Sequence, residues 1–199
     1  MFYGCYNMVK VPPLDTSLVT TFNSMFYTCS SLIDVPQMDV SSATMMEAMF
    51  SGCYNIVNIP NLGANNATSV KNMFNSCYAL SSAPLVNTSS ATNVDAMFTT
   101  TTSLVTIPEV DMQSVTSVSS APFNKCYALK DVRVKNMKVS TSFANSYFLN
   151  KDSLLYMINN EASESAITIT LNAKAYTDLA EDEDILAALA SHPNISLAK

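Results

Sequence analysis

A 24-residue repeat is the feature of this sequence that most limits what the chain can fold into. The pair Met-Phe returns every 24 residues, and in most copies a Cys follows the Phe by three positions. The pairs begin at Met1, Met25, Met49, Met73 and Met97. The Cys row contains Cys5, Cys29, Cys53, Cys77 and, after a one-residue insertion, Cys126, with Thr101 in the fifth copy. A period of this length is typical of solenoid proteins, in which each repeat forms one coil.

Each copy predicts a short helix and a short strand. Val70, Met73, Phe74 and Cys77 have the i, i+3, i+4, i+7 spacing of one helical face. Thr68 precedes them, as a Thr does in the other copies, and is a suitable N-cap. The apolar stretch after the Cys is ended by a Pro and is expected to be a strand, because proline cannot donate to a β-ladder. One coil cannot bury its apolar face alone, so we expect consecutive coils to stack with parallel strands.

The period ends after Phe148 and divides the chain in two. We expect residues 1–150 to form a solenoid of about six coils, and residues 151–199 to form an α/β C-terminal cap packed on it. In the cap, the sequence predicts a helix over 153–160 capped by Asp152, a strand over 167–171, helices over 173–180 and 184–190, and a last strand over 195–197. The first coil lacks the preceding Thr and is expected to be incomplete. Two alternatives follow: the chain is a fragment of a longer parent chain, the rest of which could dock at this N-terminal edge, or it starts abruptly and leaves the edge open.

Charge and residue types favour binding over catalysis. The net charge is -6, so the chain lacks the excess of basic residues that nucleic-acid binding favours. It has no run of about 20 apolar residues, so we expect no membrane insertion. The one histidine, His192, precedes a proline, whereas a catalytic triad needs an oriented base. One Cys per coil matches no zinc pattern, so we expect free, buried thiols. The acidic run Glu181–Asp184 could bind a divalent cation, but a match to the positive end of a helix explains it more simply. We therefore expect no catalytic residue, metal or cofactor.

The candidate ligand-binding residues come from rows that change at every coil on an otherwise regular frame. We refer to these nine residues together as the candidate face. One row contains Lys10, Asp34, Asn58, Ser82, Thr106 and Asp131, and a second contributes Gln37, Asn61 and Glu109. Rows of this kind are either a diversified recognition surface, the interpretation we favour, or unconstrained surface. The Leu-x-x-Ile spacing leaves open which strand side chains point outward.

The pattern Met-Phe-x-x-Cys-x-x-Leu-x-x-Ile-Pro-x-Leu-Asp, which covers about residues 1–150, resembles the BspA-like leucine-rich repeats. Residues 153–160 through 168–171 are similar to a segment that follows such repeats in gut-bacterial and phage proteins. The family occurs in bacterial surface proteins and in phage and prophage tail proteins. The resemblance implies an α/β, leucine-rich-repeat-like solenoid of 24-residue coils, each with a short parallel strand and a short helix.

The resemblance also implies a role in adhesion or recognition, and it brings no catalytic residues. The expected function is a non-enzymatic module of a bacterial surface protein or a phage tail protein. It would bind protein or glycan on a host or neighbouring cell through an extended solenoid face. The expected location is extracellular, at the cell surface or in the virion. The alternative is a structural spacer or assembly domain without a ligand of its own.

Overall fold

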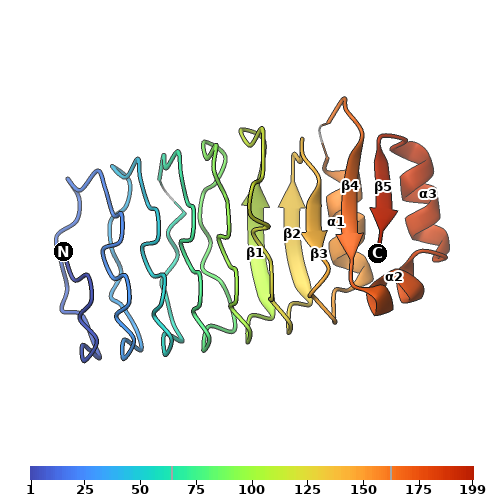
Figure 1. Cartoon of the computed structure of the whole chain (residues 1–199). Helices are drawn as coiled ribbons and strands as arrows, with labels where there is room; N and C mark the ends of the chain where they lie inside the picture. Colours follow the sequence, from blue (N-terminus) through green and yellow to red (C-terminus); the bar gives the residue numbers. More distant parts are fainter. Residues whose placement is uncertain (64, 162) are drawn as a thin grey trace.

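Consecutive coils of the chain lie side by side from the N-terminal to the C-terminal end of the molecule (Figure 1). The computed structural model describes residues 1–63, 65–161 and 163–199. Isolated parallel bridges join equivalent residues of neighbouring coils, most of them at two places, and Leu62–Val86 lies at a third. The bridges at the first place are Lys10–Asp34, Asp34–Asn58 and Ser82–Thr106, and those at the second are Thr21–Met45, Met45–Ser69 and Ser69–Asn93. Bridges between equivalent residues therefore recur from coil to coil through the repeat region.

Regular strands occur towards the C-terminal end. The strands are β1 (Thr106–Asp111), β2 (Asp131–Lys135), β3 (Thr141–Phe143), β4 (Ile167–Leu171) and β5 (Ile195–Ala198). β1 and β2 form one parallel pair, and β3, β4 and β5 form a second parallel sheet in that order. The arrows of the two sheets point in opposite directions in Figure 1. The chain thus runs one way through the first sheet and returns through the second.

β1 continues past Pro108, although the sequence predicts that the Pro row ends each strand. The register between β1 and β2 shifts between Ile107 and Val110, so β1 contains a bulge that includes Pro108. A bulge leaves one residue of the strand outside the ladder. The missing N–H of proline costs no ladder bond there, and the strand continues.

Hydrogen-bonded turns replace the helix that the Met-Phe-x-x-Cys spacing predicts. In the second coil residues 23–28 are turns, and Ser24 has a left-handed φ of 52°. Alternate backbone N–H groups donate to the next coil, as Phe22 does to the carbonyl of Met45 (2.8 Å) and Phe26 to that of Met49 (2.9 Å). Residues between them bond to the carbonyl three positions back. An α-helix would need all these donors within one coil, so the neighbouring coil decides the backbone conformation.

The Thr row also joins coils and does not cap helices. The backbone N–H and the hydroxyl of Thr44 both donate to the carbonyl of Thr20, at 2.8 and 3.2 Å. Thr68 makes the same pair of bonds to Thr44, at 2.9 and 3.3 Å. The N-cap interpretation of this row was therefore wrong, because the hydroxyl has a carbonyl of the previous coil within reach.

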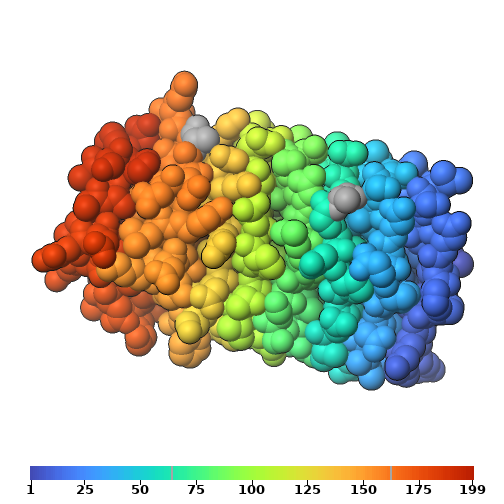
Figure 2. All heavy atoms as spheres, turned by 180° about the vertical axis from the view of Figure 1, so that it is seen from behind, coloured from blue at the N-terminus to red at the C-terminus, as the bar shows by residue number. Residues whose placement is uncertain are grey.

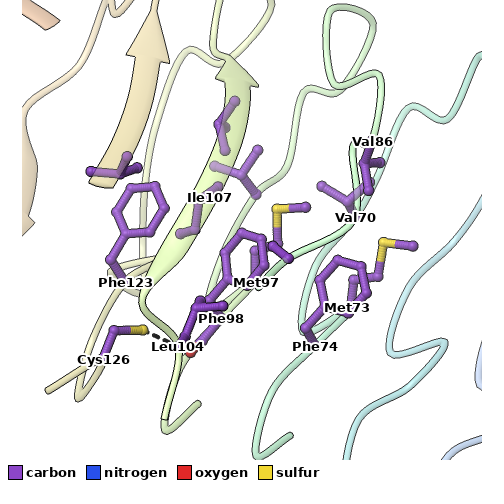
Figure 3. Packing of buried hydrophobic residues seen from close by; sticks show 14 of the residues in the cluster. Val70, Met73, Phe74, Val86, Met97, Phe98, Leu104, Ile107, Phe123 and Cys126 are labelled. Carbon is purple, nitrogen blue, oxygen red and sulfur yellow. Dashed lines mark hydrogen bonds between the residues drawn. The ribbon is translucent and has the colours of Figure 1, made fainter. Parts of the chain in front are cut away.

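Ladders of identical side chains fill the core. The phenylalanine rings stack between coils with centroids 4.8 to 6.2 Å apart. The ladder contains Phe2, Phe26, Phe50, Phe74, Phe98, Phe123 and Phe143. Figure 3 shows three of these rings in a row with methionine and aliphatic side chains packed around them. Phe50 and Phe74 are fully buried, at 0% exposure, which confirms the prediction that this row is core.

The Cys row needs a hydrogen-bond donor as well as a small side chain. All five cysteines are free thiols, four of them buried. Cys77 donates from Sγ to the carbonyl of Phe50 (3.2 Å), and the dashed line in Figure 3 marks the equivalent bond of Cys126. The hydroxyl of Thr101 donates in the same way to the carbonyl of Phe74 (2.7 Å). Burial raises the pKa of Cys126 to about 12, so this thiol keeps its proton at neutral pH.

The helices of the C-terminal section are α1 (Lys151–Asn159), α2 (Ala173–Leu179) and α3 (Glu183–Ser191). Together with β4 and β5 they confirm the elements predicted for this section, with bounds shifted by one or two residues. The cap of α1 is a correction: Asn150, and not Asp152, accepts the backbone N–H of Ser153. Asp182 caps α3, and His192 ends it.

The C-terminal section packs on the last coils. α1 contacts β2 and α3, and Lys151 of α1 pairs with Asp182 (2.8 Å) and Asp184 (2.5 Å) at the start of α3. Figure 2 shows the coils as successive bands of colour, with this section at the end opposite the N-terminus. Among the described residues, no helix is both long enough and apolar enough to cross a membrane.

Candidate ligand-binding face

Two outward residues alternate with one inward residue along the strand side of most coils. In the fifth coil Leu104 and Ile107 are buried, while Val105 and Thr106 between them reach the surface. The same order of burial recurs in the second and third coils. This three-residue pattern settles which strand side chains point outward, a question that the sequence left open. It places an aliphatic and a polar residue next to each other in each coil.

The polar row of the candidate face forms two continuous runs. Parallel bridges connect Lys10 to Asp34 and Asp34 to Asn58. Bridges and strand pairing then connect Ser82 to Thr106 and Thr106 to Asp131. Lys10, Asn58 and Ser82 are exposed and the other three are half-buried. The structure therefore brings these six side chains to one side of the molecule, one coil apart within each run.

Several side chains of the candidate face also bond to the neighbouring coil. The hydroxyl of Thr106 donates to that of Ser82 (2.9 Å). Gln37 donates from Nε2 to the carbonyl of Asn61 (3.2 Å), and Oδ1 of Asn61 accepts the backbone N–H of Leu85 (3.0 Å). These hydrogen bonds satisfy part of the donor and acceptor capacity of the side chains. The side chains therefore stabilise the stacked coils and also present polar atoms to solvent.

An apolar row lies beside the polar row. It contains Val9, Ile33, Val57 and Val105, all of them exposed. Tyrosines three residues before this row are also exposed, and Tyr54 and Tyr78 stack with their centroids 5.0 Å apart. Ser81 interrupts this row between Val57 and Val105, so the apolar surface is divided into patches. Exposed apolar patches beside polar groups are typical of interaction sites.

A charged cluster at the C-terminal end of the candidate face was not predicted, apart from Glu109 itself. Glu109 pairs with Nζ of Lys135 (2.8 Å) and accepts the hydroxyl of Tyr156 (3.1 Å). The hydrogen bond to Glu109 raises the pKa of Lys135. Burial, followed by the hydrogen bond to Glu109, raises the pKa of Tyr156. Asp111 lies 3.7 Å from Nζ of Lys135 and accepts Nδ2 of Asn136 (3.0 Å).

A cleft of about 500 Å³ opens between the β1–β2 pair and α1, and we refer to it as the β2–α1 cleft. It is lined by Thr106, Ile107, Pro108, Asp131, Val132, Arg133, Asp152, Ser153 and Tyr156. The guanidinium of Arg133 lies over the ring of Tyr156, 5.5 Å from its centroid. Thr106 and Asp131 of the candidate face therefore lie on the wall of a defined cavity.

A change of period marks the position of this cleft. Ile107 pairs with Val132, 25 residues later, but Val110 pairs with Val134, 24 residues later. The two residues Pro108 and Glu109 thus lie opposite the single outward residue Arg133. In the sequence, the end of the Pro row marks this change of period. The partners contributed by α1 could not be inferred, because nothing in the period shows where a helix would pack.

The remaining sequence-based candidates are accounted for by local structure. Asp182 and Asp184 of the acidic run pair with Lys151, and Asp182 caps α3, which supports the helix-end explanation of the run. His192 contacts the carbonyl of Ala188 through Nδ1 (2.9 Å). Across the described residues, no group of three or more His, Cys, Asp or Glu side chains could hold a metal ion.

Comparison with known proteins gives one match. The sequence model of a protein family described as "Mycoplasma protein of unknown function, DUF285" matches residues 1–136, which is more than half of the chain. No curated protein and no solved structure matches the chain.

Proposed function

The chain belongs to the family described as "Mycoplasma protein of unknown function, DUF285", and we propose that it is a non-enzymatic recognition or adhesion module. It binds protein or glycan on a host or neighbouring cell through the candidate face. In this proposal the chain is part of a bacterial surface protein or a phage tail protein. It acts outside the cell, at the cell surface or in the virion.

We propose further that the coils are leucine-rich repeats of the BspA-like type, stacked as a solenoid. The Met-Phe-x-x-Cys pattern of the sequence and the bridges between residues 24 positions apart support this classification. Solenoids bind partners over extended surfaces that several repeats share. A classification of this kind therefore fits a recognition role, although fold alone does not decide function.

One observation carries the functional proposal. Side chains that differ from coil to coil, such as Lys10, Asp34 and Asn58, are held next to one another by parallel bridges. A rigid frame thus presents a chemically varied strip at low entropic cost, which is what specific binding requires. The exposed aliphatic row beside this strip offers apolar surface to the same partner.

The proposal is tested by glycan-array and host-cell binding of the purified chain. The Asn58→Ala, Thr106→Ala double variant should weaken binding, because both side chains belong to the candidate face. Its melting temperature should fall only slightly, since Asn58 is exposed and the half-buried Thr106 loses one hydrogen bond to Ser82, worth about 0.5–1.5 kcal/mol. The matched control is the Thr116→Ala, Asn124→Ala double variant, which makes the same chemical changes at two exposed residues outside the candidate face.

Two results would count against the proposal. One is equal loss of binding in both double variants, which would mean that the candidate face is not the site. The other is loss of binding or of a turnover activity through a His192 substitution alone, with the fold intact. That result would move the site to the C-terminal section and favour an enzyme.

A further inference from the structure

The one arginine of the chain, Arg133, lies in the β2–α1 cleft. Arg133 is exposed, and within the part of the chain that the structure describes no ion pair includes it. Its guanidinium lies over the face of Tyr156. A guanidinium presents a planar fork of N–H donors that matches the two oxygens of a carboxylate. The side chain is therefore placed to bind an anion that enters the cleft.

The surface beneath Arg133 is held in place by two further contacts. The hydroxyl of Tyr156 donates to Glu109 (3.1 Å), and Glu109 pairs with Lys135 (2.8 Å). Tyr156 belongs to α1, whereas the other two residues belong to β1 and β2. The ring is thus fixed from both walls of the cleft. A ligand would meet a site whose side chains are already ordered, which lowers the entropic cost of binding.

The rest of the cleft offers hydrogen-bond acceptors. Asn150, the N-cap residue of α1, donates from Nδ2 to Oδ1 of Asp131 and keeps this carboxylate in position. Asp152 is exposed in the first turn of α1. An ionised carboxylate can only accept hydrogen bonds. A ligand that fits therefore carries an anionic group, such as a carboxylate, for Arg133 and O–H or N–H donors for Asp131 and Asp152.

We propose that the β2–α1 cleft binds an acidic sugar, whose carboxylate pairs with Arg133 and whose hydroxyls donate to Asp131 and Asp152. One sugar ring carries the anion and several donors at fixed positions, whereas an acidic peptide carries its carboxylate on a rotatable side chain away from its N–H donors. The cavity of about 500 Å³ lies within the range of small-molecule sites. This inference rests on the proposed recognition function and names a ligand class for one end of the candidate face.

The experiment titrates the whole chain with digalacturonate and follows saturation-transfer NMR and calorimetry. We expect binding, and we expect it to be lost with the uncharged dimethyl ester of the same disaccharide. Arg133→Gln should weaken binding roughly tenfold to a hundredfold, the range for loss of a charge-assisted hydrogen-bonded pair. Arg133→Lys should recover part of the loss, because it restores the charge but not the planar fork. Lys138→Gln removes an equal charge at an exposed residue outside the cleft and should leave affinity unchanged.

Three results would overturn the inference. They are no binding of digalacturonate, equal binding by the wild type and Arg133→Gln, or Arg133-dependent binding of an acidic peptide such as acetyl-Glu-Ser-Glu-amide in place of the sugar. Array and cell binding that depend on Asn58 and Thr106 would then still support the recognition function. Absence of both kinds of binding would remove the recognition function together with this inference.

Discussion

A buried carbonyl in each coil determines the side chain that the next coil can place beside it. Cys77 is fully buried and donates to the carbonyl of Phe50. Where the row changes to Thr101, the donor becomes a hydroxyl and the bond to the carbonyl of Phe74 remains. Each of these carbonyls also accepts a backbone N–H from its own coil, as that of Phe50 does from Cys53 (3.0 Å), so the side chain supplies a second hydrogen bond. The row therefore accepts Cys or Thr because both are small and both donate.

The donor requirement can be measured at Cys77. Cys77→Ala should lower the free energy of unfolding by about 0.5–1.5 kcal/mol, because the carbonyl of Phe50 loses one of its two donors and keeps only the backbone N–H of Cys53 (3.0 Å). Cys77→Ser should lose less, since its hydroxyl can make the same bond. Urea unfolding of both variants gives the comparison, with Cys5→Ala as a control at a half-buried thiol. A serine variant less stable than the alanine variant would mean that size and polarity, and not donation, govern this row.

The phenylalanine ladder leads to a second prediction. Phe74 is fully buried between the rings of Phe50 and Phe98, with centroids 5.9 and 5.2 Å away. Phe74→Ala should destabilise the protein by roughly 3–5 kcal/mol, because the coils on either side cannot close the cavity. Calorimetric or urea unfolding would measure the change. A loss below about 1 kcal/mol would contradict tight stacking of the coils.

Among the secondary-structure elements, α1 occupies the edge of β2 at which a further strand would otherwise pair. Ser153 is buried, accepts the backbone N–H of Val132 (2.9 Å) and donates to the carbonyl of Lys130 (3.2 Å). One side chain thus performs the pairing that the next coil would otherwise provide. The edge of the β1–β2 pair is covered by a helix, which is one of the ways in which proteins protect strand edges from intermolecular pairing.

The role of this edge contact is open to test. Ser153→Ala should lower the free energy of unfolding by about 1–3 kcal/mol, because the N–H of Val132 loses its partner in a buried position. Ser191→Ala removes a hydroxyl that bonds within its own exposed helix turn and should change stability much less. Chemical denaturation of the two variants makes the comparison. Similar stability losses in both would show that the edge of β2 does not depend on Ser153.

The contact between α1 and α3 should weaken in acid. The hydrogen bond from Lys151 lowers the pKa of Asp182 below its usual value. A carboxyl whose pKa is lowered by folding contributes stability above its unfolded pKa, about 3.9, and the contribution is lost as pH falls through the folded value. Asp182→Asn keeps an N-cap residue and removes the charge. Its melting temperature should therefore lie below that of the wild type at pH 7, and the difference should shrink as the pH falls below about 3.9 and through the lowered pKa of Asp182. A difference that grows in acid would contradict this.

The sequence predicted some elements better than others for a physical reason. β4 and α2 follow from alternation and helix signals within their own residues, and both were predicted. The helix expected around Phe26 does not form, because its N–H groups bond to the next coil. The β2–α1 cleft was missed for a similar reason: Arg133 and Tyr156 come together through packing of α1 on β2, which no local pattern encodes. Local patterns therefore identified the inward rows, and contacts between segments decided the rest.

Across the whole molecule, equivalent atoms make the same contacts one coil further along. Thr44 bonds to Thr20 as Thr68 bonds to Thr44, and the phenylalanine rings and thiols repeat in the same way. Stability in such a stack is close to a sum of coil terms and terms between neighbouring coils. The coil, and not the single strand or turn, is then the smallest unit that can be removed without loss of pairing.

Deletion of one coil tests this whole-molecule organisation. Removing residues 71–94 joins Val70 to Asp95 and keeps the 24-residue phase, so Phe50 should stack on Phe98. This variant should unfold cooperatively with reduced stability, since one set of coil contacts is lost. Removing only residues 71–82 deletes half as much chain but breaks the phase, and should abolish cooperative unfolding. Circular dichroism with urea would measure both, and a half-coil deletion at least as stable as the full-coil deletion would refute the prediction.

The change of period between β1 and β2 has a consequence for binding stoichiometry. A partner that contacts only an exposed row that repeats, such as Thr44, Thr68 and Thr92, meets near-equivalent positions at each coil. Several registers are then degenerate, and a chain can hold more than one copy. Opposite Pro108 and Glu109 the repeat is broken, and Arg133 has no equivalent in any other coil. A partner that contacts this coil is confined to one register and to one copy per chain. The irregular coil thus provides one defined binding position on an otherwise repetitive surface.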